Sequence, residues 1–508
     1  MVSPPTALVV AAVAVAATAS VASAAAVSQD AAMAASVGLS ATGKVFTLTP
    51  DCDRGCQAQV ASSLSARGCS NVAMLPTLRL ATANCGVAPG RAGRGVDAGT
   101  AEVAALRSLP GVMNVEDDGL VDGEEPIALD AADAEVPLKG PDGQPYFWGL
   151  DRINQAALPL DQNGNTTSCF PRQGQGVTVF VVDGGCTPNH EEFRPGQVTT
   201  RALPSSPYDP SGIDEKGHGT HVAGTVGGWR TGVAPGVTLS CIRVLGPEGS
   251  GKRSDVAAGW EAVAAAKVAN PSMPTIMHAS LSGSGTHHDA AMERLAALNV
   301  IPVVSAGNTG GDSCERTPAR SPYAITVANS DVDDTLYRSS SRGRCVNAIA
   351  PGHSILSADF RGGLKTLSGT SMSAPHVSGV VALTLAERPD GATLNVEAVK
   401  ALIFKDAPIV AGWPLGWANP SCVPPAQAPT PAPTAMPGAT TPPPGATTIP
   451  MPTAPASPSP APVATTAPPA TGGDYPWGIP PWLSRSLPEE PPAFKAPSVW
   501  GTPPWLAM

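Results

Sequence analysis

Three residues that lie far apart in the sequence have the types needed for nucleophilic attack on a carbonyl group. Ser371 lies in the small-residue segment 369–377, and the apolar residues after it predict a buried helix. A serine in the first turn of a helix lies near backbone N–H groups that stabilise negative charge. Its hydroxyl needs a neutral imidazole to accept its proton, and His218 is the candidate. Asp183 follows the apolar run 177–182 and could orient this imidazole. The three residues occur along the chain in the order aspartate, histidine, serine, which is one of the orders in which such triads recur.

The motifs around these three residues also carry a family resemblance. Residues 145 to 415 resemble the catalytic domain of the subtilase (S8) serine proteases and are most similar to the proteinase K-like branch. The resemblance implies that Ser371 is the nucleophile, His218 the general base and Asp183 the group that holds the ring. It also implies that Asn308, at the end of the segment 303–308, and the Ser371 N–H are the two donors to the oxyanion.

The fold class that we expect is α/β, a subtilisin-like three-layer fold with a mostly parallel central sheet. Apolar runs alternate with helical segments between 145 and 415, which is the pattern of parallel strands covered by helices. The predicted strands are 177–182, 238–244, 275–281, 300–305 and 324–328. The predicted helices begin at 218 and at 371 and span 254–268 and 289–298.

Substrate is expected to bind as an added extended strand, held by main-chain hydrogen bonds and therefore tolerant of many sequences. By resemblance, the substrate-binding residues are Gly249, Ser250 and Gly251 on one edge, Ser280, Leu281, Ser282 and Gly283 on the other, and Ser305, Ala306 and Gly307 in the pocket wall. The small, uncharged wall predicts an apolar or aromatic side chain before the cut. Two residues depart from the family pattern: Gly184 stands where Ser or Thr is usual, and Ser282 replaces a customary glycine.

The sequence of residues 40–125 is typical of a small α+β unit, with strands expected at 44–48 and 112–116 and helices at 58–66 and 101–107. Its end, 109–118, resembles the inhibitor-type propeptide that precedes subtilase domains. The resemblance implies that this propeptide blocks the cleft of its own chain until it is cut away. Since 148–153 resembles the start of mature proteinase K-like domains, the mature chain is expected to begin between Val121 and Gln144.

Composition indicates an exported protein. Ten cysteines in 508 residues favour an oxidising compartment, and 1–24 resembles a signal peptide with an alanine-rich core. The net charge of −10 argues against a nucleic-acid partner. Residues 420–472 are a Pro/Ala/Thr-rich linker that cannot form a core, and 473–508 form a Trp/Pro-containing tail, so we expect a disordered Pro-rich end. We expect a secreted monomer without a stable membrane span, which acts on protein or peptide substrates. The tail could associate with the cell wall.

The resemblance carries two further expectations. Cys314 and Cys345 lie where a related secreted branch pairs its cysteines, which predicts a disulfide. A structural calcium ion, which the chemistry does not need, would bind near Pro322, Ala324 and Asn347, the last an amide in the place of an aspartate.

Alternative interpretations remain open at this point. His218 and His221 have the spacing of two histidines that bind one metal ion, but a third ligand is missing. We therefore interpret His221, and likewise His376, as structural. The other histidines, His287 and His288 among them, are expected to be solvated. A catalytically weak relative that uses the subtilase fold as a binding module, anchored through its Pro-rich tail, is the alternative function.

Overall fold

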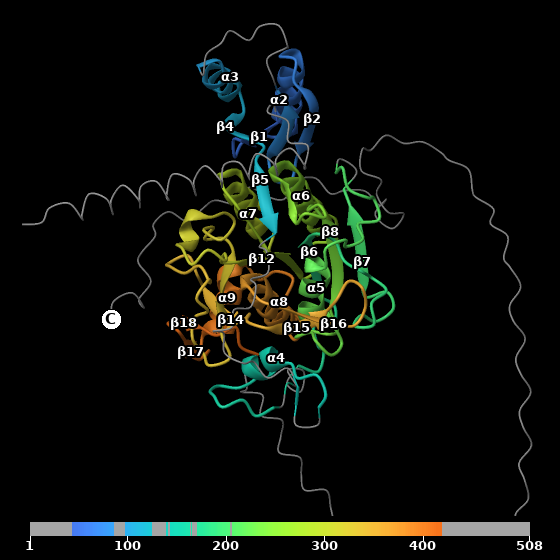
Figure 1. Ribbon diagram of the computed structural model, residues 1–508. Coiled ribbons are helices and arrows are strands. Elements are labelled where there is room, and N and C mark those ends of the chain that lie inside the picture. Colours follow the sequence, from blue (N-terminus) through green and yellow to red (C-terminus); the bar gives the residue numbers. More distant parts are fainter. Residues whose placement is uncertain are drawn as a thin grey trace, which may run out of the picture. The chain divides into compact units, whose positions relative to one another are not determined.

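The computed structural model describes residues 43–85, 97–123, 139–140, 143–162, 164, 170–203 and 206–418 (Figure 1). The predicted signal peptide, linker and tail lie outside these residues. In the part of the chain that the structure describes, no helix is both long and apolar enough to cross a lipid bilayer.

An antiparallel four-stranded sheet with two helices is built from the first described residues. The strand order is β2-β3-β1-β4. The side chains of Phe46, Leu64 and Val115 are buried in its core, and disulfides join Cys52 to Cys56 and Cys69 to Cys85. The elements are β1 (Gly43–Leu48), α2 (Arg54–Ala66), β2 (Ser70–Leu75), β3 (Leu80–Asn84), α3 (Asp97–Arg107) and β4 (Val112–Asp117).

The larger part of the chain is organised around a seven-stranded parallel sheet in the order β14-β13-β12-β10-β6-β8-β7. Strands covered on both faces are apolar throughout, and every residue of Val300–Ser305 is buried. The strands are β6 (Thr178–Asp183), β7 (Val198–Ala202), β8 (Thr238–Arg243), β10 (Thr275–Ala279), β12 (Val300–Ser305), β13 (Ile325–Ser330) and β14 (Ala348–Pro351).

Helices cover both faces of this sheet, which confirms the three-layer α/β prediction. Along β6, Val179 and Val181 belong to one core, and Phe180 and Val182 to the other. Because successive side chains of a strand point to opposite faces, these two cores lie on opposite sides of the sheet. The first core takes in α5 (His218–Gly227), α8 (Thr370–Ala386) and α9 (Val396–Phe404), and the second takes in α6 (Arg253–Ala269) and α7 (His287–Ala297).

Shorter elements complete the described part of the chain. A helix precedes β6 and two hairpins follow β14. They are α4 (Trp148–Ile153), β15 (Ile355–Ala358) with β16 (Leu364–Leu367), and β17 (Ile409–Val410) with β18 (Trp413–Pro414).

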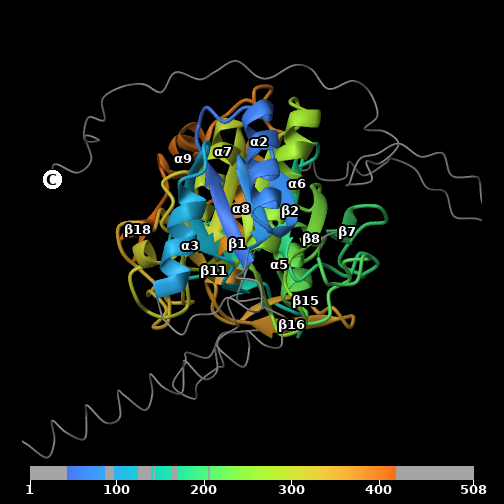
Figure 2. The ribbon, with the colours of Figure 1, turned by 90° about the horizontal axis from the view of Figure 1, so that it is seen from above.

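A second, three-stranded sheet links the small unit to the large one. Strand β5 (Leu120–Gly123) lies between β11 (Leu281–Gly283) and β9 (Ser250–Lys252) and is antiparallel to both. The small four-stranded sheet also packs on α6 and α7, which Figure 2 shows from above.

Candidate active site

Asp183 and His218 meet at the carboxyl end of β6 and the first residue of α5. The His218 Nδ1 atom lies 2.9 Å from Oδ1 and 3.0 Å from Oδ2 of Asp183, whose side chain is fully buried. A carboxylate at Nδ1 holds the tautomer in which Nε2 can accept a proton. The Gly184 N–H donates to Asp183 Oδ1 at 2.6 Å, so the backbone of the next residue supports this carboxylate although Gly184 has no side-chain hydroxyl.

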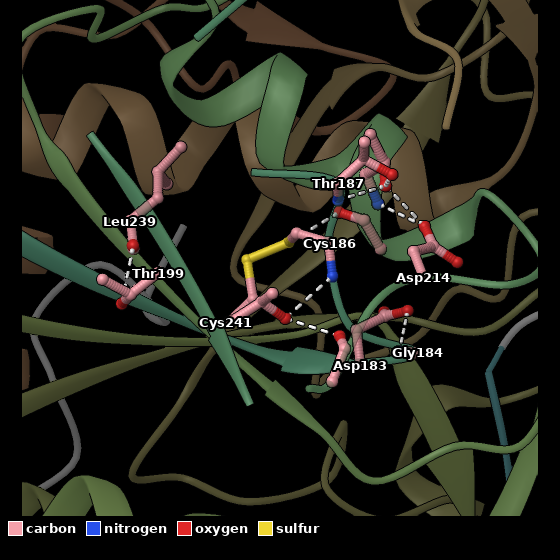
Figure 3. Close-up of a disulfide and its surroundings, with 12 residues drawn as sticks. Asp183, Gly184, Cys186, Thr187, Thr199, Asp214, Leu239 and Cys241 are labelled. Carbon is pink, nitrogen blue, oxygen red and sulfur yellow. Dashed lines mark hydrogen bonds between the residues drawn. A yellow bond between two sulfur atoms is a disulfide. The ribbon is translucent and has the colours of Figure 1, made fainter. Parts of the chain in front are cut away.

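A buried disulfide fixes the loop that follows Asp183. Cys186 is bonded to Cys241 on the neighbouring strand β8, and both are fully buried (Figure 3). One residue later, the Thr187 N–H donates to Thr220 Oγ1 in α5 at 3.1 Å. The loop is therefore tied both to the sheet and to the helix that carries His218. Sequence reasoning left the partners of these two cysteines undecided.

Ser371 is the second residue of α8, which packs against α5. Its backbone carbonyl accepts a hydrogen bond from Ser280 Oγ at 3.1 Å. Ser280 Oγ in turn lies 2.9 Å from Nε2 of His278, whose Nδ1 lies 2.9 Å from Ser378 Oγ, also in α8. Burial lowers the pKa of His278 to about 3, so this ring is neutral and acts as a polar brace between β10 and α8. We did not single out His278 from the sequence, although a histidine inside an apolar run was a usable signal.

Asn308 is held next to the start of α8. Its Oδ1 accepts hydrogen bonds from the N–H of Thr370 at 2.9 Å and from Thr370 Oγ1 at 3.0 Å. With Oδ1 engaged in this way, Nδ2 lies beside Gly369, where a Cβ atom would be only 3.0 Å from it. The structure therefore brings the Asn308 amide together with the residue that precedes Ser371.

The two predicted substrate edges lie on either side of β5. Leu281, Ser282 and Gly283 pair with Gly123, Asp122 and Val121 in that order, and the Gly123 N–H donates to the Gly249 carbonyl at 2.8 Å. The side chain of Val121 is fully buried in the core that contains Leu245 and Leu281. Gly123 lines the same pocket as Asp183, Gly184, His218 and Gly249. A segment of this chain thus occupies the place expected for substrate.

The predicted pocket wall follows β12. Ser305 and Ala306 are buried, and Gly307 has φ of 111°, in the left-handed region that favours glycine. The Gly307 N–H donates to Thr370 Oγ1 at 3.2 Å, so the wall adjoins the start of α8.

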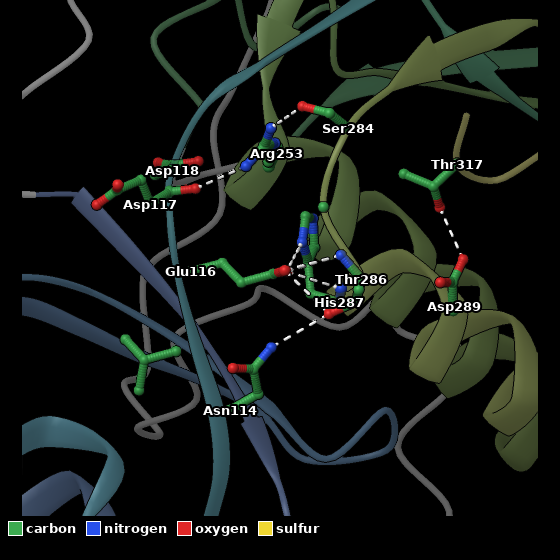
Figure 4. A network of polar contacts seen from close by, with 12 residues as sticks. Asn114, Glu116, Asp117, Asp118, Arg253, Ser284, Thr286, His287, Asp289 and Thr317 are labelled. Carbon is green, nitrogen blue, oxygen red and sulfur yellow. Dashed lines mark hydrogen bonds and ion pairs between the residues drawn. The ribbon is translucent and has the colours of Figure 1, made fainter. Parts of the chain in front are cut away.

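Glu116, at the end of the small unit, caps the first turn of α7 (Figure 4). Its carboxylate accepts from the N–H of Thr286 at 2.8 Å and of His287 at 2.9 Å, and lies 2.7 Å from His287 Nδ1. Burial alone would raise the pKa of Glu116, but these hydrogen bonds hold it at about 2. Beside it, the Ser254 N–H and Oγ donate to the Asp118 carboxylate at 2.9 and 2.7 Å.

The prediction that His287 and His288 are solvated is wrong. Both side chains have no exposed surface. His287 is bound to Glu116, and the His288 ring packs against those of Trp260 and His287, with centroids 4.5 and 4.0 Å away. The small unit and α6 supply this cover, which a local sequence window cannot show.

His221 and His376 have structural partners. His221 Nε2 lies 3.0 Å from the carbonyls of Ile355 and Lys365, and His376 Nδ1 lies 2.8 Å from the Met372 carbonyl. Burial lowers the pKa of His221 to about 3 and that of His376 to about 4, so both rings are neutral near pH 7.

The residues expected to hold calcium do not fit the ion. Asn347 Oδ1 already accepts a hydrogen bond from the Thr326 N–H at 2.9 Å, and the Lys400 ammonium lies 3.2 Å from the Pro322 carbonyl. Ala324 provides at most one further carbonyl, whereas calcium takes about six to eight oxygens. A cation here would also lie beside an ammonium group, so we derive no role for calcium at this place.

Cys314 and Cys345, for which the resemblance predicts a bridge, are joined by a disulfide in the structure. Cys169 and Cys422 lie outside the described residues.

The fold and this constellation define a class of protein, an α/β protein with a parallel central sheet that carries an aspartate at a strand end, a histidine at a helix start and a serine in the first turn of another helix. Comparison with known proteins then identifies the family. The profile of the subtilase family, Peptidase_S8, matches residues 174–438, which is just over half of the chain. The chain therefore belongs to the subtilase family.

Two named serine proteases are similar to this chain. The alkaline serine exoprotease A of Vibrio alginolyticus is 39% identical over 295 residues, which cover 58% of this chain and 52% of the relative. The extracellular serine proteinase of Thermus sp. (strain Rt41A) is 39% identical over 314 residues, which cover 61% of this chain and 69% of the relative. This chain thus spans about half the length of the first and about two thirds of the second. Among solved structures, the crystal structure of a cold adapted subtilisin-like serine proteinase aligns with 54% of this chain and 98% of its own chain. The two sequences are 38% identical in this alignment, and the TM-score is 0.48.

Proposed function

We propose that this protein is a serine endopeptidase that uses Ser371, His218 and Asp183. The observation that carries the proposal is the contact of both Asp183 carboxylate oxygens with His218 Nδ1, at the mouth of a cleft that already holds an extended strand. Membership of the subtilase family and two relatives named serine proteases support it.

In the proposed reaction, His218 Nε2 takes the proton of the Ser371 hydroxyl as Oγ attacks the substrate carbonyl carbon. The resulting tetrahedral oxyanion accepts hydrogen bonds from Asn308 Nδ2 and the Ser371 N–H. The imidazolium, stabilised by Asp183, then gives its proton to the leaving amine, and the C–N bond breaks to leave an acyl-enzyme. Water, deprotonated by His218, releases the acid and restores Ser371.

We further propose that residues 40–125 act as an inhibitory propeptide and that the chain processes itself. Strand β5 lies between the two substrate edges, and Gly123 reaches the pocket of Asp183 and His218. The maturation cut is therefore expected within the few residues after Gly123. The disulfides and the extracellular relative from Thermus support secretion, and the uncharged wall at 305–307 supports broad specificity with an apolar or aromatic residue before the cut.

Self-processing tests this proposal. We would express the full chain beside Ser371→Ala and determine the N-terminus of each product. Wild type should lose the region before Trp148, whereas Ser371→Ala should stay uncut. If both chains remained full length while folded, the endopeptidase proposal would fail and the binding-module alternative would take its place.

A further inference from the structure

The backbone carbonyl of Ser371 is held by a side chain from outside its own helix. Ser371 lies in the first turn of α8, and the residue four positions later is Pro375. In an α-helix the N–H of that later residue would donate to the Ser371 carbonyl, but proline has no N–H. The Ser280 hydroxyl donates to this carbonyl at 3.1 Å. The direction of the Ser371 carbonyl therefore depends on Ser280.

Ser280 lies where the chain leaves the large sheet for the cleft. Ala279 ends β10, and Leu281 begins β11, the cleft edge that pairs with β5. The Ser280 hydroxyl has one hydrogen, which it gives to the Ser371 carbonyl because a carbonyl can only accept. At its second contact, with His278 Nε2 at 2.9 Å, the Ser280 oxygen must therefore accept.

These directions fix the tautomer of His278. Nε2 carries a hydrogen because it donates to Ser280. Burial lowers the pKa of His278 to about 3, so the ring is neutral and Nδ1 carries no hydrogen. Nδ1 accordingly accepts from the hydroxyl of Ser378, 2.9 Å away and two turns further along α8. The chain of hydrogen bonds thus begins and ends on α8, and it runs from Ser378 through His278 and Ser280 to the Ser371 carbonyl.

The surroundings of His278 are those of an aliphatic residue. Its side chain is fully buried, and in the sheet it pairs with Val181 of β6 and Val303 of β12, which both belong to the apolar core beneath α8. A buried polar group is unfavourable unless it is hydrogen-bonded. An aliphatic side chain would fill this core without that requirement, so the contribution of the ring lies in its two hydrogen bonds.

We propose that His278 is a positioning residue for peptide-bond cleavage, which orients the Ser280 hydroxyl and through it the backbone of Ser371. The inference rests on the proposed endopeptidase function and deepens it. The Cα atom that carries the Ser371 side chain is bonded to the carbonyl carbon that Ser280 holds, so a rotation of this carbonyl moves Oγ relative to His218. Misplacement of a reacting atom by about 1 Å can lower a rate about 10²-fold.

Two replacements of similar size separate a hydrogen-bonding role of His278 from a packing role. Glutamine places an amide N–H at about the reach of Nε2, whereas methionine has the same length and no donor. Each variant is expressed as the full chain and allowed to process itself. Active sites are then counted with a fluorophosphonate probe, and kcat and KM are measured with one peptide substrate.

We expect the donor to affect kcat and not KM. His278→Met should lower kcat about three- to tenfold, as for the loss of one neutral hydrogen bond, with KM within about twofold of wild type. His278→Gln should keep kcat within about twofold of wild type. His190→Met is the matched control, because His190 is a buried histidine whose Nδ1 accepts from the Glu192 N–H at 3.0 Å, outside this chain of bonds. It should leave kcat unchanged.

A second measurement does not depend on how the variants fold. The full chain with Ser371→Ala keeps the backbone carbonyl at position 371 and does not cut itself. In its nitrogen-15 NMR spectrum with labelled histidines, we expect the His278 ring to carry its hydrogen on Nε2 and none on Nδ1. The signal is assigned by its loss when His278→Gln or His278→Met is added.

The outcomes distinguish this inference from the proposed function. An unchanged kcat in His278→Met, an equal fall in His278→Gln, or a hydrogen on Nδ1 of His278 overturns the positioning role and leaves the endopeptidase function intact. A wild-type protein that cleaves no peptide and takes up no probe overturns both.

Discussion

The contact between Glu116 and the first turn of α7 should control how tightly the small unit docks on the catalytic unit. The carboxylate is 16% exposed and accepts from two backbone N–H groups, the Thr286 hydroxyl and the His287 ring. Glu116→Gln keeps the shape but removes the charge and one acceptor oxygen. A hydrogen bond to a charged group contributes about 1.5–3 kcal/mol, and a carboxylate at a helix N-terminus about 0.3–1 kcal/mol.

The pKa of Glu116 gives an upper bound on this contribution. Lowering the pKa from 4.5 to about 2 corresponds to at most about 3.5 kcal/mol, at roughly 1.4 kcal/mol per pKa unit. Allowing for the remaining solvent exposure, we expect a loss of about 2 kcal/mol, which weakens inhibition about 30-fold at 1.4 kcal/mol per tenfold.

The assay adds the fragment 40–123, with and without Glu116→Gln, to mature enzyme and compares inhibition constants. Glu102→Gln in α3 is the matched control, because it makes the same charge change and forms no hydrogen bond to the catalytic unit within the described residues. An inhibition constant within twofold of wild type for Glu116→Gln, or an equal loss for Glu102→Gln, would refute the argument.

Two further predictions concern the oxyanion and pH. Asn308→Ala should lower kcat about 10²–10³-fold with little change in KM, which is the loss measured when such an amide donor is removed from a subtilisin. A fall in kcat of less than fivefold in steady-state kinetics would speak against Asn308 as an oxyanion donor. Because the docked pKa of Glu116 lies below its ordinary value, docking is fully supported above about pH 4.5 and weakens as pH falls toward 2. Calorimetric binding of the fragment between pH 6 and 3 to Ser371→Ala that has been matured by added wild-type enzyme checks this, and Glu116→Gln should flatten the dependence.

Motifs and periodicity predicted the parts of the fold that depend on local sequence. The strand at 300–305 and the helices around 254–268 and from 371 agree with β12, α6 and α8 to within a residue or two at each end. The predicted strand 275–281 is divided in the structure, because Ala279 ends β10 in the large sheet and Leu281 begins β11 in the cleft. A continuous apolar run cannot show that the chain changes sheets.

Features that depend on long-range contacts escaped prediction. The polar strand β7, Val-Thr-Thr-Arg-Ala, is held by pairing with β8 at the sheet edge rather than by burial of both faces. The cover of His287 and the partners of Cys186 come from segments that are distant in sequence. In the site, family motifs indicated Asp183 and Asn308, whereas the bracing by His278 follows only from three-dimensional packing.

The central claim is that Ser371 is a nucleophile activated by His218. The most direct measurement is the intact mass of the mature protein after exposure to a fluorophosphonate probe, followed by peptide mapping. We predict one adduct per chain, on the peptide that contains Ser371, and none in Ser371→Ala or in a folded His218→Gln variant after each has been matured by added wild-type enzyme. Labelling of His218→Gln at the wild-type rate, or an adduct on another residue, would contradict the account.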